Sequence, residues 1–357
     1  MNLKLYRLMK NYYKSLSTPL NLQERSFNKV KDLSYCAIFL EQGLGKSKIA
    51  IDLTLYWLKN KILTNVIIFT KKGLIQNWAE EIDKHSFLSY GVLSQNIKNN
   101  YDLFNAKVNF LISNFEVMNL EKKRIIEFAK NNEIGVILDE SAKIKNPESK
   151  LTKNFLETSV YLKKKCIMTG TPSANRPYDI WSQICFLDNG ESLGKDFKNF
   201  KKKYNLNNKL EKNQASQLLY GKNLGMLFDK IEKFSVRETK DNSGINLPKK
   251  NFINIDTNWE PIQKEKYIEL KEEFRIFIEK SGKKIEENAE SILKRIIRLI
   301  QITSNPYLVD DSYDKIPGKF TSLLSLIQQI LSKDDKLIIW TSYLKNILWL
   351  SKKLSSH

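Results

Sequence analysis

Histidine and cysteine are scarce in this sequence, and their scarcity excludes several kinds of site. The 357 residues include two His, His85 and His357, and three Cys, Cys36, Cys166 and Cys185. A catalytic triad built on His, or a His-rich metal site, is therefore not expected. No Cys-x-x-Cys pair occurs, so the sequence supports neither a zinc ribbon nor a disulfide framework. We expect the three thiols to stay reduced inside a cell.

Long apolar runs are also absent. The N-terminal stretch MNLKLYRLMKNYYKSL has Lys and Arg among its apolar residues and lacks the apolar region of a signal peptide. No run approaches the roughly 18 apolar residues that a membrane-spanning helix needs. We therefore expect no membrane partner and a cytoplasmic protein, or a nuclear one if the host is eukaryotic.

Basic residues outnumber acidic residues, and most of the basic residues are lysine rather than arginine. Lys and Arg total 59 against 40 Asp and Glu, which gives a formal net charge of +19. Such an excess favours a polyanionic partner such as nucleic acid. The abundant Lys and Asn are also typical of AT-rich coding, which requires no partner, so the charge alone leaves both explanations open.

Short apolar runs alternate with helical patterns in the first half of the chain. The runs are bounded by polar turns and fit buried parallel strands. This alternation predicts an α/β domain with a parallel sheet and helices on both faces. The expected strands are residues 36–40, 66–69, 109–112, 136–138 and 166–168.

The pattern changes near residue 189, and the length of the chain suggests roughly two domains. Residues 191–250 are polar and helical with few strand-like runs, and they contain 14 basic and seven acidic residues. The remaining chain predicts a strand and two helices, then a boundary at Pro317-Gly318, and after it the beginning of a second α/β unit. The strand is expected at 251–256 and the two helices at 260–279 and 289–302. The beginning second unit has an expected strand at 337–340 and expected helices at 319–331 and 346–354.

A glycine-rich segment, EQGLGKS, follows the first expected strand and precedes a helix. Gly43 and Gly45 allow the backbone to turn tightly and to approach an anion closely. Lys46 can reach the β- and γ-phosphates of a nucleotide, and Ser47 can hold Mg²⁺. The strict motif has a further Gly where Leu40 stands. A surface Gly-Lys turn is therefore the alternative to a phosphate loop.

An acidic pair, Asp139 and Glu140, ends the strand expected at 136–138. Ligands bind at the carboxyl ends of strands in open α/β sheets. In a phosphate-loop enzyme the first carboxylate would hold the water shell of Mg²⁺, and the second would polarise the attacking water. An acidic helix cap is the alternative. Together with the loop, the pair favours a nucleoside triphosphatase.

The order of these segments resembles the Swi/Snf-type DNA translocases of the superfamily 2 helicase-like ATPases, most closely their compact bacterial and phage members. The stretches similar to motifs I, Ia, Ib, II and III and to the Leu-Pro-x-Lys signature are EQGLGKS, VIIFTKKGLIQNWAEEI, LISNFEVM, LDESAKIKNPESK, MTGTPSANRPYDIWSQICFLD and LPKK. QITSNPYL, GKFTSLLSLIQQIL and KLIIWTSYLKNILWLSKKL resemble the family's Pro-Tyr-Leu helix end and the opening of its second lobe, up to motif IV.

The resemblance implies an α/β fold with a RecA-like P-loop NTPase lobe, a helical insertion and the beginning of a second RecA-like lobe. On this basis we expect an N-terminal extension at 1–20 and the ATP-binding lobe 1 at 21–190. A basic helical insertion would follow at 191–257, a helical linker at 258–313, and a partial lobe 2 at 314–357.

The resemblance also implies ATP and Mg²⁺ as cofactors and assigns residues to them. The residues implied to hold the nucleotide are Gly43, Leu44, Gly45, Lys46 and Ser47. Gln23 would read the adenine, although a surface helix position is the alternative. Ser47 and Asp139 would hold Mg²⁺, and Lys46, Asp139 and Glu140 would carry the catalysis.

Further residues are implied to connect the nucleotide with DNA. The segment that couples nucleotide state to DNA contacts would be Thr169, Gly170 and Thr171. The implied contacts to the DNA backbone are Lys71, Lys72, Asn77, Asn114 and Arg176, each of which has ordinary solvation as its alternative. We expect Trp78 to be packed under the stretch similar to motif Ia rather than stacked on a base.

The family's fourth residue of motif II is commonly His, where this sequence has Ala142. We therefore expect the coupling to run through Ser141 or through residues 169–171. Motifs V and VI, with their arginine finger, would lie beyond residue 357, as in a truncated chain, an interrupted gene, or half of a split enzyme.

The resemblance implies an ATP-dependent motor acting on double-stranded DNA through backbone contacts. A second chain supplying the rest of lobe 2 is a further implied partner. The alternatives are a non-hydrolysing DNA- or partner-binding module derived from such a motor, and an unrelated small-molecule ATPase or kinase.

Overall fold

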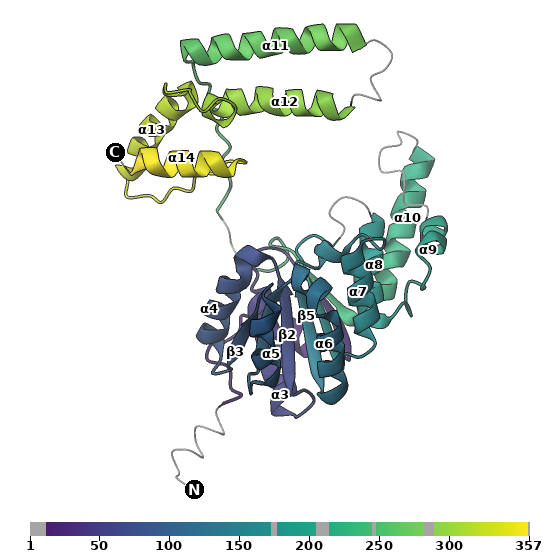
Figure 1. Cartoon of the computed structure of the whole chain (residues 1–357). Helices are drawn as coiled ribbons and strands as arrows, with labels where there is room; N and C mark the ends of the chain where they lie inside the picture. The colour runs from purple at the N-terminus through teal and green to yellow at the C-terminus, as the bar shows by residue number, and fades with distance from the viewer. Residues whose placement is uncertain (1–11, 173–176, 205–213, 245–247, 282–288, 356–357) are drawn as a thin grey trace. The chain divides into compact units, whose positions relative to one another are not determined.

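The computed structural model describes residues 12–172, 177–204, 214–244, 248–281 and 289–355. The chain divides into two units, Met1–Leu247 and Pro248–His357. Each unit is built around its own packed helices, and the first also contains the sheet (Figure 1).

The first unit is centred on a seven-stranded sheet with the order β3-β4-β2-β5-β6-β1-β7. Every pairing in it is parallel. Because parallel strands run in one direction, their carboxyl ends share one edge of the sheet. The strands are β1 (Tyr35–Leu40), β2 (Asn65–Thr70), β3 (Tyr90–Leu93), β4 (Phe110–Asn114), β5 (Ile134–Asp139), β6 (Lys164–Met168) and β7 (Ser235–Glu238).

Helices cover both faces of this sheet, as the sequence predicts. Alternate strand residues point to opposite faces, and the two faces belong to separate apolar clusters. Val66 and Ile68 pack with α2 (Asn21–Val30), α3 (Lys46–Lys59) and α4 (Ile75–His85). Ile67 and Phe69 belong to the cluster of the other face. The helices contributing to that cluster are α5 (Ile97–Asn105), α6 (Met118–Asn131), α7 (Lys150–Ser159), α8 (Trp181–Asp188), α9 (Phe197–Tyr204) and α10 (Gln214–Ile231).

The five strands predicted for this unit are confirmed, but two more complete the sheet. β3 is a short edge strand with a half-exposed pattern, and β7 is four residues long with the polar sequence SVRE. β7 pairs with β1 at the opposite edge. It lies in the stretch 191–250, which the sequence predicts to contain few strands. The prediction misses β7 because three of its four residues are polar and it therefore lacks an apolar run.

The strands predicted at 251–256 and 337–340 are wrong, since both stretches are irregular. Neither has a neighbouring strand among the described residues of its unit. An apolar run becomes a strand only where another strand satisfies its backbone groups. Phe252 and Ile253 are 90% and 81% exposed, respectively, so the first run is not buried either.

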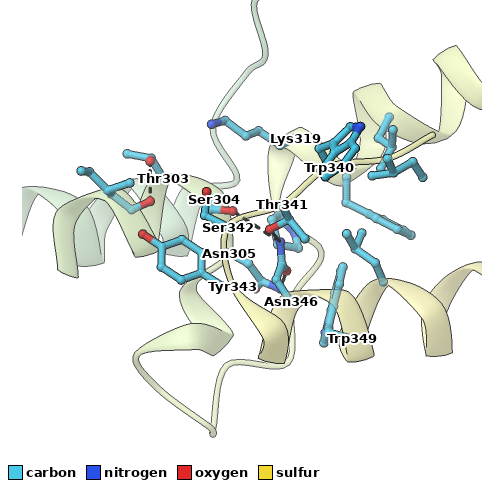
Figure 2. A pocket seen from close by; sticks show the side chains of 16 residues that line it. Thr303, Ser304, Asn305, Lys319, Trp340, Thr341, Ser342, Tyr343, Asn346 and Trp349 are labelled. Atoms are coloured by element: carbon cyan, nitrogen blue, oxygen red, sulfur yellow. Dashed lines mark hydrogen bonds between the residues drawn. The ribbon is translucent and has the colours of Figure 1, made fainter. Parts of the chain in front are cut away.

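The second unit is helical in its described parts. The predicted helices are confirmed as α11 (Pro261–Ser281), α12 (Ala289–Ser304), α13 (Gly318–Leu331) and α14 (Leu344–Leu354). Gln263 fastens α11 to α12 by donating a 2.8 Å hydrogen bond from Nε2 to the carbonyl of Ile302. A pocket of about 430 Å³ lies between α12, α13 and α14, with Trp340 and Trp349 in its wall (Figure 2). Among the described helices, none is long and apolar enough to cross a membrane.

Candidate nucleotide-binding site

The loop between β1 and α3 has the geometry of an anion-binding turn. Gly43 and Gly45 have φ angles of +86° and +79°, which L side chains rarely adopt. A Cβ on Gly45 would also stand 2.1 Å from Nε2 of Gln23. Helix α3 begins at Lys46, so its unbonded first-turn N–H groups and positive dipole end adjoin the loop.

Lys46 lies over the strand end of this loop. Its Nζ donates hydrogen bonds of 2.8 Å and 3.4 Å to the carbonyls of Leu40 and Glu41. Burial lowers the pKa of Lys46, while the carboxylates of Glu140, Asp139 and Glu41 act in the opposite direction. The ammonium therefore lies within the field of the acidic pair that the sequence singles out.

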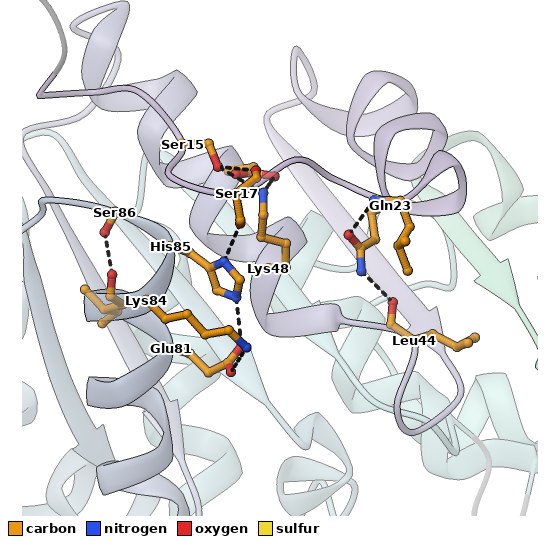
Figure 3. Close-up of polar contacts among 12 residues, drawn as sticks. Ser15, Ser17, Gln23, Leu44, Lys48, Glu81, Lys84, His85 and Ser86 are labelled. Atoms are coloured by element: carbon orange, nitrogen blue, oxygen red, sulfur yellow. Dashed lines mark hydrogen bonds and ion pairs between the residues drawn. The ribbon is translucent and has the colours of Figure 1, made fainter. Parts of the chain in front are cut away.

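Gln23 connects the start of α2 to the loop. Its Oε1 accepts a 3.0 Å hydrogen bond from the backbone N–H of Leu20, the N-cap residue of α2. This bond caps the helix. Its Nε2 donates a 3.4 Å bond to the carbonyl of Leu44 (Figure 3). The side chain is buried, so it is not the surface residue of the alternative interpretation. Its role in reading adenine stays a prediction.

Asp139 is held from one side. Its Oδ2 accepts a 2.9 Å bond from the Thr70 hydroxyl and a 2.8 Å bond from Nε1 of Trp78. Trp78 is 3% exposed, which confirms that it is packed rather than available for stacking. Both bonds end on Oδ2, so Oδ1 is the oxygen that a cation or its water shell would contact.

The residues present fit a Mg²⁺ ion shared with phosphates. Among the described residues, no group of three or more His, Cys, Asp and Glu could hold a metal alone. Mg²⁺ is commonly held by one or two carboxylates together with substrate phosphates and water. Asp139 supplies such a carboxylate, and Ser47 stands in the first turn of α3 beside the loop.

Glu140 occupies a strained backbone conformation. Its φ and ψ are 57° and 52°, in the left-handed region that costs a residue with a Cβ roughly 1–2 kcal/mol. The turn that follows Glu140 is held by α8, because the buried Ser141 hydroxyl donates a hydrogen bond to Oε1 of Gln183 in that helix. Strain of this kind persists only where the surroundings determine it.

The segment after β6 packs directly on the loop between β1 and α3. The N–H of Thr169 donates to the carbonyl of Ile38, and the N–H of Thr171 donates to the Thr169 hydroxyl, both at 3.2 Å. A Cβ on Gly170 would lie 3.5 Å from the carbonyl of Leu40. The three residues predicted to couple nucleotide and DNA are thus neighbours of the loop.

The chain before α2 is fastened to the helices behind the loop. Lys48 of α3 donates a 3.0 Å bond to the Ser15 hydroxyl and pairs with Asp52. The Ser17 hydroxyl bonds to Nδ1 of His85 at the end of α4 (Figure 3). Burial lowers the pKa of His85. Nothing in the sequence pattern indicates this arrangement.

The predicted DNA contacts differ in their accessibility. Lys71, Lys72 and Asn77 are exposed at the carboxyl end of β2 and the start of α4. Asn114 is 5% exposed, and its Oδ1 accepts a bond from the N–H of Val117 as a helix cap. Arg176 lies outside the described residues. All five stay predictions as DNA ligands.

Three side chains of the site are missed by the sequence patterns. Thr70 and Trp78 hold Asp139, and Gln183 holds Ser141. Thr70 ends β2, which pairs with β5 so that Phe69 lies opposite Leu138, but this pairing is known only from the structure. The other two partners become visible only when helices and strands are placed in space.

Comparison with known proteins gives a consistent result. The family model for the SNF2-related domain matches residues 23–308. An uncharacterized ATP-dependent helicase of Mycoplasma genitalium is 28% identical over 318 residues, covering 85% of this chain and 28% of that protein. A probable ATP-dependent DNA helicase of Arabidopsis thaliana is 25% identical, covering 84% of this chain and 28% of that protein. The chain thus spans 28% of the length of these relatives.

Solved structures share the fold. The SWI2/SNF2 ATPase core of Sulfolobus solfataricus in complex with double-stranded DNA has a TM-score of 0.56 and 23% identity, covering 96% of this chain and 72% of that chain. The SWI2/SNF2 ATPase core domain of Sulfolobus solfataricus has a TM-score of 0.52 and 25% identity, covering 94% of this chain and 67% of that chain.

Proposed function

Because the chain belongs to the SNF2-related domain family, we propose that it is the ATP-binding half of an ATP-dependent motor acting on double-stranded DNA. Its substrate would place it in the cytoplasm, or in the nucleus of a eukaryote. One observation carries the proposal: the loop after β1 turns through Gly43 and Gly45, both at positive φ, into the start of α3, where Nζ of Lys46 lies 2.8 Å from the carbonyl oxygen of Leu40. That arrangement suits a triphosphate, and one solved SWI2/SNF2 ATPase core that shares the fold is in complex with double-stranded DNA.

The site's residues divide the chemistry of hydrolysis among them. The N–H groups of the loop and of the first turn of α3 bind phosphate oxygens, and Lys46 balances their charge. Ser47 and Asp139 would hold Mg²⁺, which neutralises charge on the phosphates. Glu140 orients a water molecule and takes its proton as the water oxygen bonds to the terminal phosphorus. The bond from that phosphorus to the ADP oxygen then breaks.

DNA binding would use the loops at the same edge of the sheet. Lys71, Lys72 and Asn77 are exposed beside β2, next to the strand that ends in Asp139. Contacts of this kind reach phosphates, so binding should depend on salt and little on base sequence. Residues 169–171 touch the phosphate loop and would transmit the nucleotide state to those contacts.

The test is steady-state ATP hydrolysis at low salt, with and without double-stranded DNA, in the chain with a completing second lobe added and in its Glu140→Gln variant. The proposal predicts turnover that DNA increases and that the variant lacks. Turnover that does not respond to DNA would contradict it and favour a small-molecule ATPase.

We also propose a second candidate, half of a split ATPase completed by another chain. It is favoured by residues 337–340, an apolar run in which Ile338 and Trp340 are 76% and 89% exposed. A further strand would bury this run. Hydrogen exchange tests the proposal: the amides of 337–340 should exchange rapidly in the chain alone and become protected when a completing lobe is added. Unchanged exchange in a mixture that hydrolyses ATP would contradict it.

A further inference from the structure

Strand β7 brings a second lysine to the phosphate loop. The N–H of Glu41 donates a 3.0 Å bond to the carbonyl of Glu238, the last residue of β7. In return, the N–H of Lys240 donates a 2.8 Å bond to Oε2 of Glu41. These two bonds, with the pairing of Leu40 and Glu238, fix the backbone of Lys240 beside the loop.

The side chain of Lys240 extends over the glycine turn. Its Cε lies 4.0 Å from the point where a Cβ of Gly43 would stand. The following turn is closed by a 2.6 Å bond from the Ser243 hydroxyl to the carbonyl of Lys240. Lys240 is therefore held at its main chain, and the end of its side chain lies beside the loop.

The nearest carboxylates are already engaged. Glu238 pairs with Arg25 at 3.6 Å, and the Glu41 carboxylate accepts the backbone N–H of Lys240. Within the part of the chain that the structure describes, the Lys240 ammonium has no hydrogen bond or ion pair. A half-buried cation next to an anion-binding turn, without an anion of its own, is suited to an anionic ligand.

We propose that Lys240 is a second phosphate-directed lysine, whose ammonium binds the terminal phosphate of a nucleoside triphosphate. The inference rests on the proposed function and adds a residue to it. The Lys46 ammonium lies near the carbonyls of Leu40 and Glu41, at the same end of the loop as Lys240. Ser47 and the helix start mark the other end. The phosphates of the nucleotide would span the two ends of the loop, with the terminal phosphate between Lys46 and Lys240.

This placement makes Lys240 a specificity determinant for triphosphate over diphosphate. A triphosphate carries more negative charge than Mg²⁺ and Lys46 together neutralise, and Lys240 supplies the remaining cation. A diphosphate bound through Ser47 and the helix start would not reach it. Replacing Lys240 should therefore weaken Mg·ATP binding more than Mg·ADP binding.

The experiment is a calorimetric titration of the full chain with Mg·ATP and Mg·ADP. Lys240→Ala should weaken Mg·ATP binding about tenfold and Mg·ADP binding by a much smaller factor. Lys240→Arg should retain most of the ATP affinity because it keeps the charge. Lys233→Ala removes an exposed lysine just before β7 and should change neither affinity.

Each contrary outcome has its own meaning. If Lys240→Ala leaves the ATP affinity unchanged while Lys46→Ala abolishes binding, this inference is overturned and the proposed function stands. If Lys240→Ala weakens ATP and ADP equally, the assignment to the terminal phosphate is overturned. If neither lysine affects ATP binding, the proposed function fails as well.

Discussion

The hydroxyl of Ser141 donates a 2.6 Å hydrogen bond to Oε1 of Gln183, 42 residues further along the chain. Nε2 of Gln183 in turn donates to the carbonyls of Pro172 and Asp179, each at 3.0 Å. Ser141 and Gln183 are fully buried. One amide thus joins the turn after the acidic pair to the segment that follows residues 169–171.

Ser141→Ala should uncouple these two parts of the site. The change leaves Oε1 of Gln183 buried without its donor, which costs about 1–3 kcal/mol of stability. In a form that hydrolyses ATP, stimulation by DNA should fall more than basal turnover. Gln183→Leu should have the same effect, and the double variant should lose little more, because the pair acts as one unit. Equal losses of basal and stimulated rates would contradict the coupling role.

Trp78→Phe should raise the Mg²⁺ concentration that nucleotide binding requires. The ring packing is largely retained, but Oδ2 of Asp139 loses its 2.8 Å bond from the indole N–H. Changes in groups that orient a metal ligand typically cost about tenfold or more in metal affinity. The measurement is ATP binding as a function of Mg²⁺ concentration.

Trp181→Phe is the matched control for that change. Its indole N–H donates a 3.0 Å bond to the carbonyl of Gly194, away from the acidic pair. The control should alter stability without altering the Mg²⁺ requirement. The same Mg²⁺ requirement in Trp78→Phe as in the control would contradict the role assigned to Asp139.

Glu140→Gly should be more stable than Glu140→Gln, although both should fail to hydrolyse ATP. Glycine relieves the left-handed backbone strain, while its greater freedom in the unfolded chain offsets part of the gain. We expect a net difference of up to about 1 kcal/mol. Chemical denaturation of the two variants measures it, and a less stable glycine variant would show that Glu140 is not strained.

The stability of the protein should decrease as the pH falls below about 6.5, partly through His85. Burial lowers the pKa of His85, so the unfolded chain takes up the proton at a higher pH than the folded chain does. Stability is therefore complete above the unfolded pKa and is lost below it. His85→Gln should flatten this part of the curve of unfolding free energy against pH. An unchanged slope would contradict the burial of a neutral imidazole.

The sequence predicts the parts of this protein that are encoded locally. The turn at Gly43 and Gly45, the lysine that follows, and the acidic pair are contiguous motifs, and their strands are strongly apolar runs. The partners of Asp139 and Ser141 are not local, because they depend on the order β2-β5-β6 and on the placement of α8. These contacts could not be derived from spacing.

Strand formation likewise depends partly on the local sequence and partly on neighbouring strands. β7 is short and polar, yet it forms because β1 offers it a free edge. Residues 337–340 are strongly apolar, yet they form no strand, since no described neighbour pairs with them. Apolar patterning therefore identifies interior strands reliably here and fails at edges and where a partner strand is missing.

The most direct test of the account is an equilibrium titration of the chain with Mg·ATP, comparing the wild type with Lys46→Ala and with Lys59→Ala. Lys59 is exposed at the far end of α3 and serves as a charge-matched control. The account predicts binding in the wild type, the same affinity in the control, and a loss of about tenfold or more in Lys46→Ala. Equal affinities in all three proteins would contradict the assignment of the loop between β1 and α3 as the triphosphate site.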